Sequence, residues 1–250
     1  MRLNTAEWGS GPPLVCLHGV TSHGRRYETM AARLPGRRVL GVDLRGHAGS
    51  GWDPPWTVAQ HIEDLVETAA ALEVERADWV GHSFGGLLVA RLTVERPDLV
   101  SRAVLLDPAL HIDPAVALER AEAMRADISF ASPDDAIETR LGDGTLFTTP
   151  RSVLEREAEQ HLEQGDDGRW RWRYCAPAVV AAFGEMAAPA PAWPRCPTLV
   201  VLGARSWLPV DVPILPNVTA VTVPGGHGVL WDDFEETIDA VTRFLASAGV

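Results

Sequence analysis

A serine flanked by glycines stands between a predicted strand and a predicted helix. Residues 81–85 are G-H-S-F-G, which fits the pattern G-x-S-x-G, and they follow an apolar stretch that ends at Val80. On so sharp a turn the serine adopts a strained backbone conformation, and glycines two positions away leave room for the flanking strand and helix. This context predicts that Ser83 is a nucleophile.

A second group is needed to activate the serine. A hydroxyl is a weak nucleophile at neutral pH, and histidine is the side chain whose ordinary pKa suits removal of its proton. Of the eight histidines, His227 lies in a glycine-flanked loop after the last predicted strand and follows Ser83 in the chain. We predict that His227 is the general base.

Four segments of the chain resemble the α/β-hydrolase superfamily. Residues 81–85 look like its nucleophile turn, 17–20 like its oxyanion loop, 43–50 like the loop after its next strand, and 224–227 like its terminal histidine loop. The third segment departs from the family at Ala48, where glycine is usual, which we interpret as a structural adjustment. The resemblance spans nearly the whole chain apart from a divergent cap, and it implies a serine hydrolase with an inserted helical cap.

The acid that orients His227 has two candidates. The family most often places it a few residues after the penultimate strand, but Ser206 occupies that position here. A minority of the family uses a carboxylate directly after the preceding core strand, where this chain has Asp107. We predict that Asp107 is the acid, and Asp211 is the alternative. A non-catalytic explanation of Asp107 is that it caps the turn that follows.

The resemblance also implies donors for an oxyanion and a substrate pocket. A tetrahedral intermediate is stabilised by backbone N–H groups, here those of Val20 and Phe84. Apolar and aromatic side chains usually line such a pocket, although core packing explains most of the candidates equally well. The candidate substrate contacts are His23, Leu87, Trp170, Trp207 and Trp231.

Short apolar runs bounded by turn residues recur along the chain. Such runs are typical of strands that are buried on both faces of a parallel sheet. Amphipathic stretches lie between several of them, and this alternation predicts a doubly wound, mostly parallel α/β sheet. The predicted strands are 14–17, 38–42, 77–80, 102–106, 198–202 and 218–223, and the predicted helices around them are 57–72, 84–96 and 232–246.

The middle of the chain has a different pattern. Residues 110–195 are predicted to be rich in helix, and several of these helices open with proline, which suits the first turn. We therefore predict a core of residues 1–109 and 196–250 with a helical cap inserted at 110–195. The predicted cap helices are 114–126, 133–141, 150–162 and 176–186, with a short extended segment at 170–174.

Composition excludes several classes of function. The formal net charge of −12 repels phosphate backbones and anionic lipid. No lysine occurs, which excludes Schiff-base chemistry and a P-loop lysine, and the three cysteines lack zinc-ligand spacing. No run has the length of a membrane span or the apolar core of a signal peptide. We predict a cytoplasmic enzyme that acts on a small molecule without metal, cofactor, nucleic acid or membrane.

Three functions fit these observations. The leading prediction is hydrolysis of a carboxylic ester, thioester or lactone of a small apolar substrate through an acyl-serine intermediate. The resemblance leaves carbon–carbon bond hydrolysis of ring-fission products as an alternative, although such enzymes typically carry Asn in place of His82. A non-catalytic binder that retains the fold is the other alternative, suggested by Ser206 at the usual place of the acid.

Overall fold

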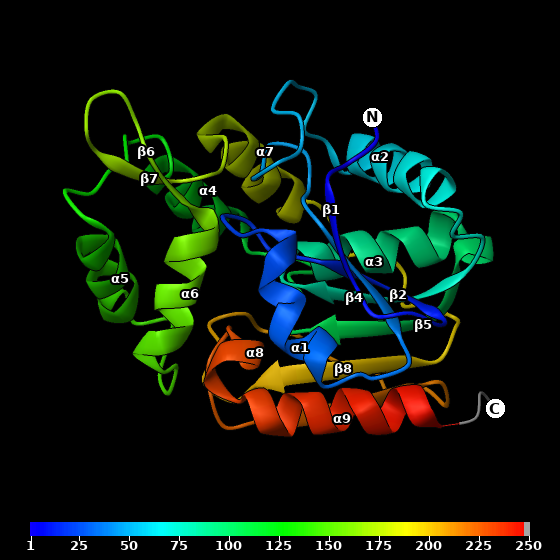
Figure 1. Cartoon of the computed structure of the whole chain (residues 1–250). Coiled ribbons are helices and arrows are strands. Elements are labelled where there is room, and N and C mark those ends of the chain that lie inside the picture. Colours follow the sequence, from blue (N-terminus) through cyan, green and yellow to red (C-terminus); the bar gives the residue numbers. More distant parts are fainter. Residues whose placement is uncertain (248–250) are drawn as a thin grey trace.

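A seven-stranded sheet forms the centre of the protein in a computed structural model, which describes residues 1–247 (Figure 1). Its strand order is β1-β3-β2-β4-β5-β8-β9, and every neighbouring pair is parallel except β1 with β3. The predicted doubly wound, mostly parallel sheet is thus confirmed. The strands are β1 (Thr5–Trp8), β2 (Pro13–Leu17), β3 (Arg38–Val42), β4 (Ala77–His82), β5 (Val100–Leu106), β8 (Thr198–Gly203) and β9 (Val218–Val223).

The edge strand β1 is the one strand of this sheet that the sequence patterns did not indicate. It has only four residues, none of them buried, and it pairs on one side only, with β3. A short strand at a sheet edge needs no continuous apolar run, because one side and part of each face remain open to solvent. The other six strands lie in the sheet where the apolar runs predicted them.

Helices cover both faces of the sheet. Successive side chains of a strand point to opposite faces. Accordingly, Val15 and Leu17 pack in the apolar cluster beneath α2 (Val58–Ala71) and α3 (Phe84–Glu95). Leu14 and Cys16 pack in the cluster on the other face, with α1 (Glu28–Ala32) and α9 (Phe234–Ala246). In Figure 1, α9 runs below the sheet and α2 and α3 lie above it.

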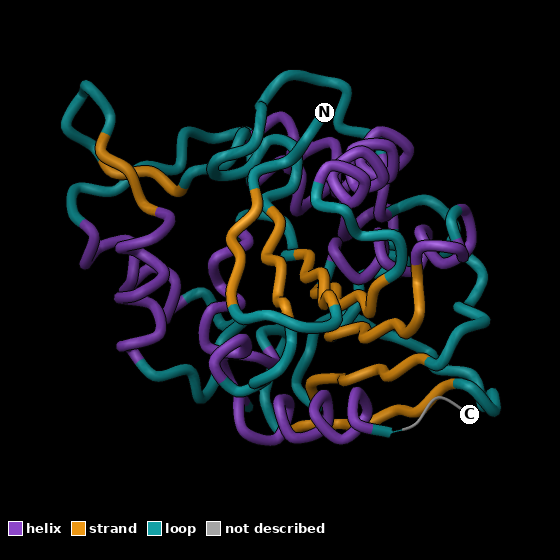
Figure 2. Tube along the Cα trace, turned by 45° about the vertical axis from the view of Figure 1, so that its right-hand side comes forward, coloured by secondary structure: helices purple, strands orange, loops and turns teal. Residues whose placement is uncertain are grey.

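The chain between β5 and β8 leaves the sheet and forms a separate helical layer (Figures 1 and 2). Its helices α4 and α7 pack into the main apolar cluster, whereas α5, α6 and the hairpin of β6 and β7 surround a second cluster, to which Trp231 from outside this segment also belongs. We propose that residues 110–195 act as a cap. The elements are α4 (Pro114–Ala123), α5 (Pro133–Gly142), α6 (Arg151–His161), β6 (Leu162–Gln164), β7 (Trp170–Trp172) and α7 (Ala176–Met186).

Three expected helices have different ends in the structure. The helix predicted at 114–126 ends at Ala123. The helix predicted at 150–162 stops at His161, because Leu162 begins the hairpin by pairing with Trp172. The helix predicted at 232–246 begins at Phe234 as α9. A separate short helix, α8 (Val229–Asp232), precedes it, with Asp233 in a non-helical conformation between them. Within residues 1–247, no helix combines the length and the apolar character needed to cross a bilayer.

Buried histidines, whose pKa values burial lowers, make the stability of this fold depend on pH. Burial lowers the pKa of His47 to about 4 and those of His61 and His161 to about 3, while an unfolded chain titrates near about 6.5. Between these values the unfolded state binds more protons, so stability is complete above about pH 6.5 and is lost as the pH falls. Each histidine adds a slope of up to about 1.4 kcal/mol per pH unit in this window.

Urea denaturation at a series of pH values measures this slope. We expect the free energy of unfolding to fall steadily between about pH 6 and pH 4 and to gain no histidine-dependent slope above about pH 7.5. A free energy of unfolding that stays constant down to about pH 4 would contradict the burial of these neutral imidazoles.

Candidate active site

Ser83 lies on a sharp turn between β4 and α3. Its backbone angles are φ 54° and ψ −118°, an unusual conformation for a residue with a side chain. The turn is tight enough that a Cβ atom on Gly81 would lie 2.2 Å from the carbonyl oxygen of Gly85, and one on Gly85 would lie 2.3 Å from that of Leu17. Glycine is therefore required on both sides, and the geometry agrees with the strained turn expected from the sequence.

Asp107 and His227 form a hydrogen-bonded pair at the carboxyl ends of the strands. Asp107 follows β5, is fully buried and adopts a positive φ of 41°. Its Oδ2 lies 2.6 Å from Nδ1 of His227, and its Oδ1 accepts the backbone N–H of Gly203 at 2.9 Å. The alternative acid, Asp211, is exposed on the loop after β8. The structure thus brings Asp107, and not Asp211, to the histidine.

Ser206 supports this carboxylate. Its hydroxyl donates to Oδ2 of Asp107 at 2.5 Å and accepts the backbone N–H of Leu208 at 3.1 Å. Ser206 stands where the resemblance places the usual acid. The departure from the family is therefore local: a hydroxyl at this position binds the carboxylate that the neighbouring strand supplies.

Ser83 and His227 line the same cavity, whose volume is about 300 Å³. Because Nδ1 of His227 faces a carboxylate, this nitrogen carries the ring proton, and Nε2 is left as the basic site. His82 donates from Nε2 to the backbone carbonyl of His227 at 2.8 Å. Burial holds the pKa of His82 well below its usual value, so its ring is a neutral support for the histidine loop.

Two aspartates bind backbone N–H groups of the loop that carries His227. Asp233 accepts the backbone N–H of Gly225 at 2.6 Å, and Asp232 accepts that of Gly226 at 2.8 Å. Both residues stand at the start of the helix predicted at 232–246, which is by itself a sufficient reason for acidic residues, so no local pattern indicates this role. Asp232 also accepts the backbone N–H groups of Thr148 and other residues of the cap segment 147–149, at 3.0 to 3.1 Å. This side chain therefore links the histidine loop to the cap.

The segments 17–20 and 81–85, which are expected to supply the N–H groups of an oxyanion site, lie against each other at Ser83. Val20 lines the cavity, and a Cβ atom on Gly19 would lie 2.8 Å from that of Ser83. Phe84 is the first residue of α3, so its N–H has no acceptor within the helix and lies at the positive end of the helix dipole. His18 orients the first loop, because its Nδ1 donates to the carbonyl of Gly19 at 2.7 Å.

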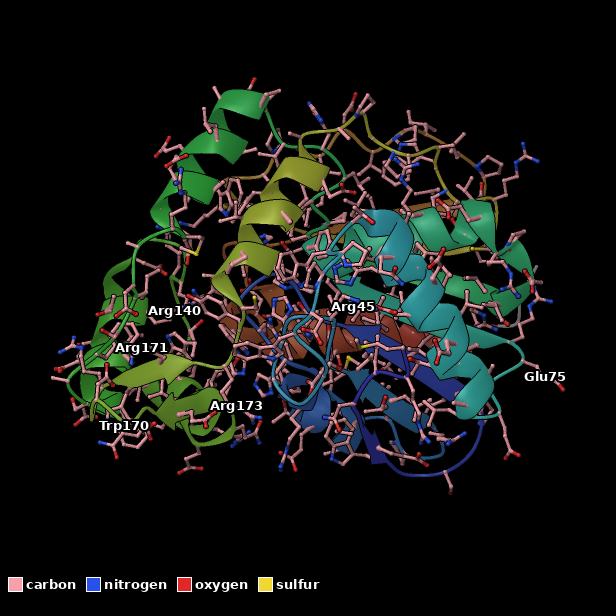
Figure 3. The ribbon with its side chains drawn as sticks, turned by 90° about the horizontal axis from the view of Figure 1, so that it is seen from above. Arg45, Glu75, Arg140, Trp170, Arg171 and Arg173 are labelled. Carbon is pink, nitrogen blue, oxygen red and sulfur yellow. The ribbon has the colours of Figure 1, made fainter. Side chains whose placement is uncertain are left out.

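The expected substrate contacts divide into two groups. Trp207 and Trp231 line the cavity with Ser83, whereas the other three candidates do not. Leu87 is buried and packed inside the main apolar cluster. Trp170 belongs to β7, is bridged to the backbone of Phe130, and sits near the outer end of the cap (Figure 3). We leave Leu87 and Trp170 out of the proposed substrate contacts.

His23 joins the core to the cap instead of lining the cavity. It is enclosed, with 2% of its surface exposed. Its ring stacks on that of His161 with centroids 4.6 Å apart, and its Nε2 lies 3.2 Å from Oε2 of Glu157. Both of these partners belong to α6. His23 is therefore also left out of the proposed substrate contacts.

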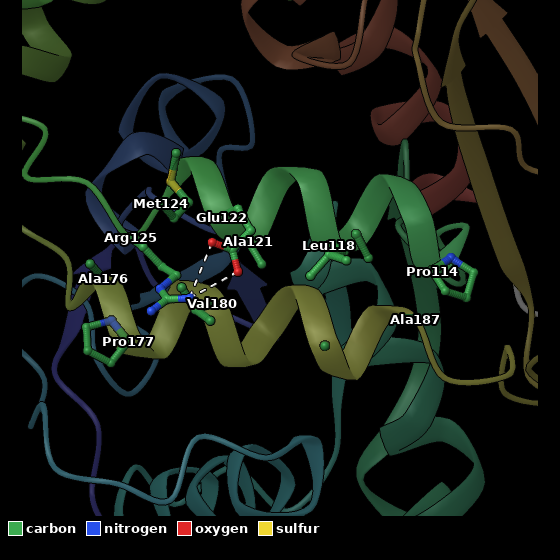
Figure 4. Close-up of a pocket in the computed structure, with 12 residues that line it drawn as sticks. Pro114, Leu118, Ala121, Glu122, Met124, Arg125, Ala176, Pro177, Val180 and Ala187 are labelled. Carbon is green, nitrogen blue, oxygen red and sulfur yellow. Dashed lines mark hydrogen bonds and ion pairs between the residues drawn. The ribbon is translucent and has the colours of Figure 1, made fainter.

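A groove that is larger than the cavity at Ser83 lies elsewhere on the protein. It has a volume of about 670 Å³, runs between α4 and α7 and is lined mostly by small and apolar side chains (Figure 4). It contains none of the predicted site residues. The cavity at Ser83 does contain residues that the sequence reasoning missed, among them Arg26, Arg120 and Arg140. They come from three distant segments, so no local pattern could have indicated them.

Comparisons with known proteins identify one family. Residues 14–240 match the "Alpha/beta hydrolase family". Lipase LipV of Mycobacterium tuberculosis is 37% identical over 191 residues, 74% of this chain and 71% of that protein. Esterase YbfF of Escherichia coli is 27% identical over 258 residues, 98% of each chain. The crystal structure of E-2-(acetamidomethylene)succinate hydrolase has a TM-score of 0.84 and 25% identity, and the match covers 98% of this chain and 95% of that one. The chain belongs to the α/β-hydrolase family.

Proposed function

We propose that the protein is a serine hydrolase that cleaves a carboxylic ester, thioester or lactone of a small molecule. The observation that carries the proposal is the pair of the buried Asp107 and the partly buried His227, 2.6 Å apart, in one site with a serine on a strained turn. Relatives named as a lipase and an esterase support the same class of reaction. We also propose that the protein acts in the cytoplasm.

The first half-reaction forms an acyl-enzyme. Nε2 of His227 takes the proton of the Ser83 hydroxyl as its oxygen attacks the carbonyl carbon of the substrate. The negative charge that develops on the carbonyl oxygen is stabilised by the backbone N–H groups of Val20 and Phe84. Asp107 holds the ring of His227 and stabilises its charged form. The histidine then gives the proton to the leaving alcohol or thiol, and the acyl group remains on Ser83.

The second half-reaction releases the acid. A water molecule takes the place of the leaving group, and His227 removes its proton as the water attacks the acyl carbon. Collapse of the second tetrahedral intermediate breaks the bond to Ser83, and the serine oxygen recovers the proton from His227. The apolar walls of the cavity, including Trp207 and Trp231, would shield the ester from bulk water and pack against apolar parts of the substrate.

Partitioning of a shared intermediate tests this proposal. 4-Nitrophenyl butyrate and phenyl butyrate differ in leaving group but give the same butyryl-serine. With a fixed concentration of added methanol, we expect the enzyme to form methyl butyrate and butyrate in the same ratio from both esters. Chromatography of the products measures this ratio. A ratio that differs between the two esters would exclude a common acyl-enzyme, and a folded protein that turns over neither ester would favour the binder.

A further inference from the structure

Positive charge is concentrated in the cavity that holds Ser83. Arg26 from the 3-10 turn Gly24–Tyr27, Arg120 from α4 and Arg140 from α5 all line it. Among the described residues that line this cavity, Asp143 is the single carboxylate. This excess of cations stands out in a chain whose formal net charge is −12.

Two of these arginines have no carboxylate partner. Arg140 lies 3.8 Å from Asp143, but within residues 1–247 neither Arg26 nor Arg120 has a carboxylate oxygen within 4 Å. Glu157 is the acidic residue whose charge acts on Arg26, and it pairs with His23 at 3.2 Å. Guanidinium groups remain charged at any physiological pH, so both side chains bring uncompensated charge to the cavity wall.

Stacking holds the two guanidinium groups in place. Arg26 lies over the ring of Trp231 at 4.3 Å, and Arg120 lies over that of Trp207 at 4.7 Å. Stacking on an aromatic face fixes the plane of a guanidinium and leaves the N–H groups at its edge available. Nη1 of Arg26 donates to the hydroxyl of Ser22 at 3.0 Å and lies 3.5 Å from Nδ1 of His82, while the enclosed Nε has no acceptor within the described part of the chain. An anionic ligand would supply acceptors to such groups.

We propose that the substrate of this site carries a carboxylate group, held by Arg26 and Arg120 while its scissile carbonyl lies at Ser83. This inference rests on the proposed serine hydrolase and names its substrate class as the monoester of a small dicarboxylic acid, or an equivalent anionic ester. Charge-assisted, bidentate hydrogen bonds make arginine the side chain best suited to a carboxylate. The apolar walls between the arginines and Ser83 then pack against the carbon chain of the substrate.

A pair of matched esters tests the proposal. Monomethyl adipate and methyl hexanoate have the same acyl chain length and leaving group, and they differ in one terminal carboxylate. We expect kcat/KM for monomethyl adipate to exceed that for methyl hexanoate by at least tenfold, and Arg120→Gln to lower this ratio by about tenfold or more, as for loss of a charged hydrogen bond. A ratio near one in the native enzyme, or a ratio that Arg120→Gln leaves unchanged, would overturn the proposal.

The control variant is Arg125→Gln. Arg125 follows α4 directly, is exposed, and pairs with Glu122 at 3.1 Å on the wall of the outer groove (Figure 4). Because it does not line the Ser83 cavity, its replacement should leave the selectivity ratio unchanged. Equal losses in the two variants would indicate a general effect of surface charge and would count against the proposal.

Calorimetric binding separates this inference from the proposed function. Adipate and dimethyl adipate are titrated into the Ser83→Ala protein and into the same protein with Arg120→Gln added, so that the diester is not hydrolysed during the measurement. We expect adipate to bind at least tenfold more tightly than the diester, with this preference reduced in Arg120→Gln. Hydrolysis of methyl hexanoate without any preference for adipate would refute the carboxylate site alone. Tight adipate binding without hydrolysis of either ester would refute the hydrolase alone.

Discussion

Replacement of Ser83 by alanine should lower kcat for ester hydrolysis by about 10⁴-fold or more. The variant has no oxygen that can form the acyl-enzyme, so any remaining rate would come from water attacking a bound ester. Alanine fits the space of serine, and the hydroxyl of Ser83 does not hold the turn together, so stability should change by less than about 1 kcal/mol. Steady-state kinetics with 4-nitrophenyl butyrate and urea denaturation measure the two effects.

A matched control for this variant is Ser152→Ala. Ser152 is an exposed serine on α6, far along the chain from the strained turn, and its replacement should leave kcat within about twofold of the native value. Activity that survives Ser83→Ala in a folded protein would remove the serine from the mechanism. The reaction would then have to proceed through general-base attack of water or at another residue.

The second large effect is expected at Asp107. Its carboxylate accepts Nδ1–H of His227, which fixes the tautomer that leaves Nε2 basic. In Asp107→Asn the amide N–H can face Nδ1, which favours the opposite tautomer, and kcat should fall by about 10³- to 10⁴-fold. Asp211→Asn should have little effect, because Asp211 is exposed outside this contact. Kinetics of both variants decide between the two acids, and the reverse ranking would overturn the triad.

A second substitution shows whether the loss at Asp107 is the loss of an acid. Ser206 already touches Asp107 from the loop after β8, at the position where the family most often carries its acid. In the background of Asp107→Asn, the change Ser206→Asp supplies a carboxylate from that loop. We expect at least about tenfold recovery of kcat if the missing function is the carboxylate, as the effect of one charged hydrogen bond. No recovery, together with lowered stability, would indicate a purely structural role.

Much of the core could be predicted from the sequence, because its strands are buried on both faces. Successive residues of central strands such as β4 and β5 face opposite sides of the sheet, and both sides are covered. These strands therefore appear in the sequence as continuous apolar runs. The edge strand β1 is not subject to this constraint, and its residues remain partly exposed. The turn at Ser83 could also be predicted from the sequence, because its close backbone contacts tolerate only glycine at positions 81 and 85.

The cap and the substrate contacts could not be predicted in the same way. Whether an aromatic residue faces the cavity depends on how separate helices pack, and sequence spacing does not encode this. Trp207 and Trp231 reach the cavity, whereas Trp170 is held at the outer hairpin by its pairing with Phe130. Arg26 lies about a hundred residues before Arg120 and Arg140, which stand on two different helices, so only the folded chain brings the three together.

The aspartates after the histidine show a different limit of local patterns. Asp232 and Asp233 stand at a helix start, which is a sufficient reason for acidic residues. In the structure their carboxylates accept backbone N–H groups of Gly225 and Gly226, and so fix the loop that carries His227. Because the helix start already explains the two aspartates, the sequence pattern does not indicate that they also bind the His227 loop, a contact that exists only in the folded chain.

Covalent labelling with a fluorophosphonate tests the central claim most directly. The reagent reacts with serine hydroxyls that a neighbouring base activates, and mass spectrometry of the digested protein locates the adduct. We predict one adduct, on the peptide that contains Ser83, and none in the Ser83→Ala variant. Absence of labelling in the folded native protein, or an adduct at another residue, would contradict the assignment of Ser83 as a nucleophile activated by His227 and Asp107.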